Sequence, residues 1–198
     1  MSLGFILSLG FGTWDFADAW QLTPELAAEI AAKEKAVATK PYYPHPHFDL
    51  AVTYAYTNRI EEAWAELKKI PELDPDFKQA ALRMYKKNAA RDSRDWKLRF
   101  RLAFVLYFND KKKEAIREFE GVLKIDPRNI WAMGLMATIY GDMGEPEKGI
   151  QYVKQALAVD ADVAVLHYLL AQGYYKQGKN IEGFRETAEA LRLKALGK

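Results

Sequence analysis

The sequence predicts an all-α fold, a solenoid in which helix–turn–helix units stack along one axis. Three prolines set the period. Pro41 and Pro75 lie 34 residues apart, and Pro127 follows Pro75 after 52 residues, which is one further period and 18 residues more. Small residues and turn-forming residues recur in the same register. A period of roughly 20 to 50 residues is typical of arrays in which each unit buries its apolar face only against its neighbours.

The period defines four clear units, residues 44–77, 96–129, 130–163 and 164–198. The eighth position of each unit is alanine: Ala51, Ala103, Ala137 and Ala171. The turn between the two helices of each unit holds residues that tolerate tight turns: Asn58, Asp110, Gly144 and Gly178. Small side chains on facing helices allow close packing, so each unit should form a helical hairpin.

Two other stretches are expected to be helical but interrupt the repeat. Residues 78–95 predict one added helix, with apolar residues at roughly helical spacing, and an odd helix should change the pitch of the superhelix. Residues 23–43 predict a helix from Pro24 to Thr39. Its place in the array stays open, because Glu29 and Lys33 stand where the repeats have small and aromatic residues.

These recurring positions resemble the tetratricopeptide repeat family, whose pattern has a Trp-x-x-Leu-Gly-x-x-Tyr core followed by Ala, Phe, Ala and Pro. The resemblance covers the four units and implies a right-handed superhelix that binds other proteins. The family's Trp is replaced here by His47, Arg99, Met133 and His167. An ordinary helical bundle is the alternative, but bundles have no fixed repeat register of this length.

The resemblance implies that the first helix of each unit lines a concave surface. The residues mapped there, with the neighbouring Arg101, are Phe48, Val52, Lys97, Phe100, Arg101, Phe104, Tyr107, Trp131, Thr138, Tyr168, Gln172 and Tyr175. One interpretation is an aromatic trough that binds an apolar helix or an extended peptide. The other is that curvature or the added helix buries several of these side chains. Only Lys97 and Arg101 could hold a partner's carboxylate.

Residues 1–22 begin with a stretch, Met1 to Trp14, that has no charged side chain. Three interpretations stay open: a secretory signal, shallow membrane insertion, or packing against protein. We expect docking on a membrane-associated assembly, with a periplasmic setting preferred over a cytoplasmic one. The docking side chains would be Leu3, Phe5, Ile6, Leu7, Leu9, Phe11 and Trp14.

Charge is uneven along the chain, although the net charge is only +2. A basic strip follows the first unit and consists of Arg83, Lys86, Lys87, Arg91 and Arg94. It could meet an acidic partner or anionic headgroups, or it could be an ordinary solvated helix face. So small a net charge gives no reason to expect nucleic acid.

The sequence offers little catalytic chemistry. It has no cysteine, which removes thiolate metal sites and cysteine nucleophiles, and it contains no phosphate loop or nucleophile elbow. His45 and His47, in a segment expected to be extended, are a candidate metal pair, but spacing fixes no carboxylate beside them. We therefore expect no cofactor and no enzymatic activity.

The expected function is a non-enzymatic scaffold, a subunit that stabilises a membrane-associated complex. A transient, chaperone-like assembly factor is the alternative, and a metal-binding subunit that uses His45 and His47 is a more distant one. The helix expected from Asn180 to Ala195 carries Leu191 and Leu193. A partner or a second copy of the chain could cover it, so self-association through this helix is a further expectation.

Overall fold

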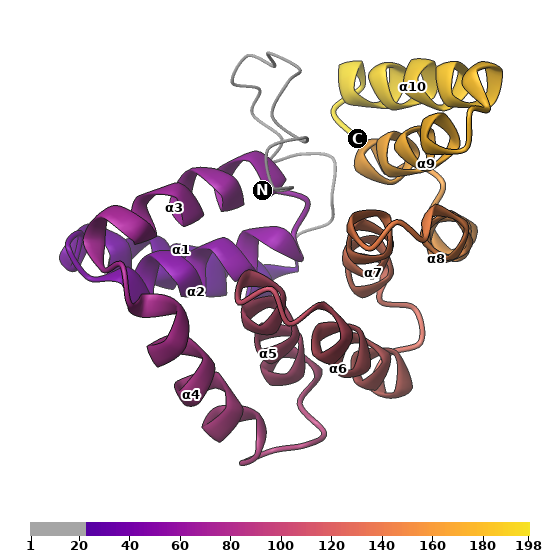
Figure 1. The fold of residues 1–198 in the computed structure, drawn as a ribbon. Helices are drawn as coiled ribbons and strands as arrows, with labels where there is room; N and C mark the ends of the chain where they lie inside the picture. The colour runs from indigo at the N-terminus through magenta and orange to yellow at the C-terminus, as the bar shows by residue number, and fades with distance from the viewer. Residues whose placement is uncertain (1–22) are drawn as a thin grey trace.

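The computed structural model describes residues 23–198, which form ten α-helices and no strand (Figure 1). The predicted all-α fold is confirmed. The helices are α1 (Pro24–Thr39), α2 (Pro44–Ala55), α3 (Ile60–Leu73), α4 (Phe77–Ala89), α5 (Trp96–Phe108), α6 (Lys112–Ile125), α7 (Ile130–Asp142), α8 (Pro146–Val159), α9 (Ala164–Lys176) and α10 (Asn180–Ala195). The predicted docking segment, Leu3 to Trp14, lies outside the described residues.

Eight of these helices form the four predicted hairpins, α2–α3, α5–α6, α7–α8 and α9–α10. The residues predicted to form the turns do so with a left-handed backbone: φ is 60° at Asn58, 59° at Asp110, 77° at Gly144 and 71° at Gly178. Small residues bring the paired helices together. A Cβ on Gly149 would lie 2.9 Å from the carbonyl oxygen of Ala137, so this contact between α7 and α8 requires glycine.

In the first and last units, the repeat position of the family's Trp holds a histidine whose two ring nitrogens both make polar contacts; we call this arrangement a histidine clamp. In the first unit, Nδ1 of His47 lies 2.5 Å from Oε2 of Glu66 on α3, and Nε2 lies 2.9 Å from the carbonyl oxygen of Pro41. The last unit repeats both contacts, at 2.7 and 3.0 Å, from His167 to Glu186 and Ala161. The imidazole thus ties the two helices of its unit to the loop that precedes the unit.

The added helix α4 packs against α5 and covers α2. The ring of Phe48 lies 5.6 Å from the ring of Phe77 and 5.3 Å from that of Tyr85, both on α4. Phe48 and Phe77 are completely buried. Helix α4 therefore adds a layer to the apolar core instead of forming a hairpin with a partner.

The hairpins follow one another around an arc, so that α10 returns toward α3 (Figure 1). The first and last hairpins of the arc meet in an ion pair, in which Nζ of Lys194 on α10 lies 3.1 Å from Oε1 of Glu61 on α3, 133 residues earlier. Helices α3, α5, α7 and α9 consequently surround a common interior. Within residues 23–198, no helix has the length and apolar character needed to cross a membrane.

Candidate functional site

The interior of the arc contains an apolar groove of about 880 Å³, counting the part open to solvent. Four helices supply most of its wall, and the side chains are almost all apolar. They are Ile60, Trp64 and Leu67 of α3, Phe104, Tyr107 and Phe108 of α5, Trp131, Leu135 and Thr138 of α7, and Val165, Tyr168 and Leu169 of α9. Segments more than 100 residues apart in the sequence thus build one surface, because the arc closes on itself.

Five of the residues predicted for the trough line this groove: Phe104, Tyr107, Trp131, Thr138 and Tyr168. Trp64 was missed because it belongs to the second helix of its unit. The same repeat position in the third unit holds Ile150, which packs so closely on α9 that a Cβ on Gly173 would lie 2.6 Å from its Cγ1. In the first unit the chain continues into α4, and Trp64 lines the groove. A Trp at position 64, where the third unit has Ile150, was the sequence signal that could have identified this groove residue.

Other predicted trough residues lie in the core. Phe48, Val52 and Phe100 are completely buried, and Phe104 is only 6% exposed although it lines the groove. Helix α4 covers Phe48, as the second interpretation of the sequence had it. The three completely buried residues cannot touch a partner in this structure. Gln172 and Tyr175 on α9 are at least partly exposed, but neither lines the groove.

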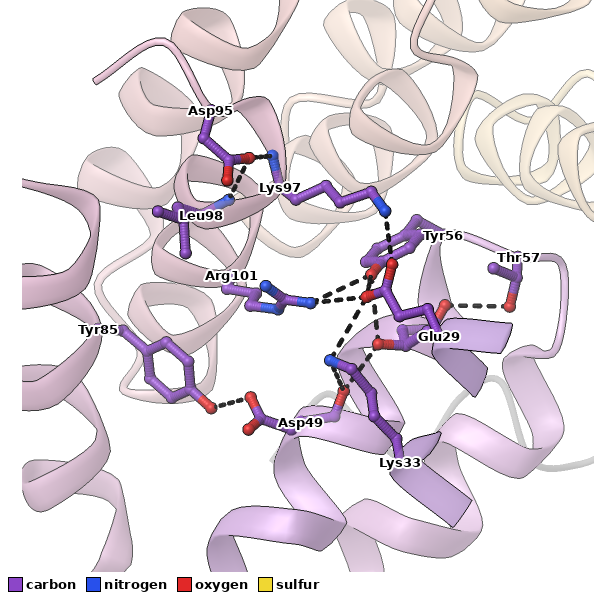
Figure 2. A network of polar contacts seen from close by, with 11 residues as sticks. Glu29, Lys33, Asp49, Tyr56, Thr57, Tyr85, Asp95, Lys97, Leu98 and Arg101 are labelled. Carbon is purple, nitrogen blue, oxygen red and sulfur yellow. Dashed lines mark hydrogen bonds and ion pairs between the residues drawn. The ribbon is translucent and has the colours of Figure 1, made fainter. Parts of the chain in front are cut away.

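Lys97 and Arg101 bind a carboxylate of their own chain, that of Glu29 on α1 (Figure 2). Nζ of Lys97 donates to Oε2 of Glu29 at 2.5 Å, and Nη2 of Arg101 donates to Oε1 at 2.8 Å. The hydroxyl of Tyr56 donates to the same carboxylate at 2.6 Å. The cations that the sequence offered to a partner's carboxylate are therefore already occupied.

The cluster holds Glu29 in its charged form. Burial raises the pKa of Glu29, but hydrogen bonds from Lys97 and Tyr56, together with the positive charges of Lys33 and Lys97, outweigh burial and lower the pKa to about 2. Burial raises the pKa of Tyr56, so its hydroxyl stays neutral and remains a donor. The contact is thus ionic at neutral pH.

Helix α1 is held by polar contacts and by a small apolar face, on which Leu26 and Val37 are partly buried against the core. Ile30 is its one buried side chain. Besides Glu29, the carboxylate of Glu34 accepts a hydrogen bond from the hydroxyl of Tyr54 at 2.7 Å and one from Arg59 at 3.1 Å. Such a helix depends on its ion pairs more than the helices of the hairpins do, because it buries little apolar surface.

The two histidines proposed as a metal pair do not converge. The segment is helical, not extended, because Pro44 occupies the first turn of α2, where proline fits. Residues two apart on a helix point about 200° apart around its axis. The ring of His45 packs edge-on against Phe77 with centroids 4.8 Å apart, while both nitrogens of His47 already face Glu66 and Pro41. Residues 23–198 contain no cluster of three metal-binding side chains.

The basic strip lies on the outer surface. Arg83, Lys86 and Lys87 project from α4, and Arg91 and Arg94 follow in the loop before α5. All five are exposed, and none lines the apolar groove. Binding of an acidic partner there stays a prediction.

Comparison with known proteins supports the repeat assignment. A family model described as tetratricopeptide repeat matches residues 111–173. Among solved structures, a crystal structure of MamA has a TM-score of 0.51 and 17% identity, covering 93% of this chain and 97% of that chain. A second, "MamA MSR-1 C2", has a TM-score of 0.53 and 14% identity, with 88% and 90% covered. No curated protein matches the chain in sequence. At such identities the likeness to MamA concerns the fold.

Proposed function

We propose, from the premise that this chain carries tetratricopeptide repeats and is a protein–protein interaction scaffold, that its apolar groove binds an apolar segment of a partner protein. The observation that carries the proposal is the composition of the wall, where Trp64, Trp131, Leu135 and Leu169 face one open interior. Apolar grooves of this kind bind the apolar face of a partner helix or the side chains of an extended peptide. Large aromatic side chains are the usual anchors of protein interfaces.

The polar atoms of the groove favour an apolar occupant. The hydroxyl of Tyr107 donates to Asp142 at 2.7 Å, and that of Thr138 donates to the carbonyl oxygen of Gly134 at 3.1 Å. These groups are satisfied within the chain and gain little from a polar ligand. The hydroxyl of Tyr168 has no hydrogen-bond partner within residues 23–198, so it is available for one orienting hydrogen bond.

The shape of the wall suits a helix or an extended peptide. Helices α5, α7 and α9 each contribute aromatic residues, so anchors on a partner helix at positions i, i+4 and i+7 would meet successive units. Glu29 already occupies the two cations of the inner surface, Lys97 and Arg101. The apolar groove is therefore the part of this surface that we assign to the partner.

Selection of displayed peptides against the full chain tests this proposal. Enriched peptides should carry large apolar residues at helical or alternating spacing, and they should compete with one another. Two groove variants, Leu135→Glu and Thr138→Arg, should lose binding while they remain folded. The matched control is Ile125→Glu on α6, whose parent side chain is 38% exposed and lies outside the groove. Binding that survives both groove variants, or that the control abolishes equally, would refute the groove as the site.

We place the partner in a membrane-associated complex, on the basis of the charge-free sequence from Met1 to Trp14. A complex subunit should dissociate slowly from its partner, whereas a transient assembly factor should dissociate quickly. The dissociation rate of the purified complex therefore separates the two roles. Recovery of the chain in the soluble fraction alone, with and without residues 1–20, would contradict the membrane setting.

A further inference from the structure

Helix α10 exposes an apolar stripe that no helix of residues 23–198 covers. Ile181 is 76% exposed, Phe184 71% and Leu191 49%, and Ala188 and Ala195 are also exposed. Their spacing of three and four residues places all five on one face of the helix. The opposite face, with Gly183, Ala190 and Leu193, is buried against α9.

Part of this stripe corresponds to the contact between successive units. The repeat position of Phe184 is held in earlier units by Ile116 and Ile150, which are 7% and 8% exposed. Ile150 is buried because it packs against Gly173 on α9, in the unit that follows. Phe184 has no such helix against it within the part of the chain that the structure describes.

The rest of the stripe does not fit a contact between repeats. The positions of Ile181 and Ala188 are held in the third unit by Glu147 and Lys154, and in the second unit by Lys113 and Glu120. All four charged residues are exposed to solvent. In α10 the same two positions are apolar, so the stripe is wider than the packing of another repeat requires. Its width indicates that the helix is covered by something other than a further repeat packed as in the earlier units.

We propose that the occupant is a second copy of this chain, and that two α10 helices pair antiparallel with Ala188 at the twofold axis. A twofold axis there places Ile181 opposite the partner's Ala195 and Phe184 beside the partner's Leu191. The small side chain of Ala188 lets the two helices approach closely at the crossing point. The pairing covers all five residues of the stripe at once.

Charge complementarity favours the antiparallel direction. Glu182, Arg185, Glu189 and Arg192 alternate in sign along one flank of the stripe. In an antiparallel pair the second copy runs in the opposite direction, so Glu182 meets Arg192 of the other copy and Arg185 meets Glu189 of the other copy. In a parallel pairing this flank would face the opposite flank of the other copy, so these pairs could not form. The intrahelical pair of Arg192 and Glu189, at 2.6 Å, would then be shared across the interface.

Disulfide trapping tests both the pairing and its direction, because the natural chain contains no cysteine. On mild oxidation of the full chain, Ala188→Cys should form covalent dimers rapidly, since the two copies meet at the axis. Ile181→Cys alone should form few, whereas a mixture of Ile181→Cys and Ala195→Cys should form mixed dimers. The control is Ala158→Cys, an exposed alanine on α8 away from the stripe, which should not cross-link above background.

Sedimentation of the unmodified chain over a wide concentration range supplies the independent measurement. One helix from each copy makes a small interface, so reversible and concentration-dependent dimerisation is expected. Arg185→Glu with Arg192→Glu, and separately Glu182→Arg with Glu189→Arg, should each give monomers, and mixing the two proteins should restore dimers. A wild-type chain that stays monomeric throughout, or rapid cross-linking of Ile181→Cys alone, would overturn the proposal. Both readouts are independent of groove binding, so either proposal can fail alone.

Discussion

Glu29 on α1 and Lys97 on α5 are joined by a hydrogen bond of 2.5 Å between Oε2 and Nζ, although 68 residues separate them in the sequence. Arg101 and Tyr56 complete the contact. It fastens a helix with one buried side chain onto the inner face of the repeats (Figure 2). The position of α1 against Lys97 and Arg101 therefore depends on the carboxylate of Glu29.

Substitution of Glu29 should loosen α1 more than the rest of the chain. In Glu29→Gln, Lys97 and Arg101 lose their shared anion, and we expect a loss of about 1 to 3 kcal/mol in the free energy of unfolding. Hydrogen exchange should speed up in α1 while α7 to α10 stay protected. Glu72→Gln, at an exposed site on α3, serves as the control. Unchanged exchange in α1 would show that the contact does not hold the helix.

The same carboxylate predicts a dependence of stability on pH. The pKa of Glu29 is about 2 in the folded chain, below its ordinary value of 4.5. A group with a depressed pKa contributes stability that is fully present above its unfolded value and is lost as the pH falls toward the folded one. Stability should therefore decline between pH 4.5 and about pH 2, and less steeply in Glu29→Gln. Urea unfolding at several pH values measures both slopes; identical slopes would exclude the contribution of Glu29.

The two histidine clamps should differ in their importance. His47→Ala leaves the carboxylate of Glu66 and the carbonyl oxygen of Pro41 without this partner, at an expected cost of about 2 to 3 kcal/mol. His167→Ala should cost less, because the side chain of His167 is 14% exposed and that of His47 only 4%. Chemical denaturation of the two variants gives the order, and the reverse order would contradict the burial argument.

The ion pair between Glu61 and Lys194 should affect shape more than stability. The side chain of Glu61 is 51% exposed, and exposed pairs contribute about 0 to 1 kcal/mol. In Glu61→Gln we expect a broader distance distribution between spin labels placed on α3 and α10, with little change in Tm. Labelling is direct because the chain has no cysteine. A distribution as narrow as that of the parent chain would mean that packing alone holds the arc closed.

Local features of the fold could be predicted well from the sequence. Asn58 and Asp110 form left-handed turns where the period places them, because the backbone preference of a turn residue depends on its neighbours in the chain. The range Pro24 to Thr39 matches α1 residue for residue. The pairing of Glu29 with Lys97 could not be predicted, since no repeat position relates residues so far apart.

The sequence by itself determined the helices, the turns and the solenoid, because a 34-residue register and the small residues in it constrain neighbouring helices directly. Only the tertiary structure decided which inner-surface residues a partner can reach. Phe48 and Phe100 are buried while Trp131 and Tyr168 line the groove, although all four were mapped to the same surface. The physical reason is that α4 covers Phe48 and that Tyr56 and Phe119 pack against Phe100, so exposure depends on neighbours that are distant in the sequence.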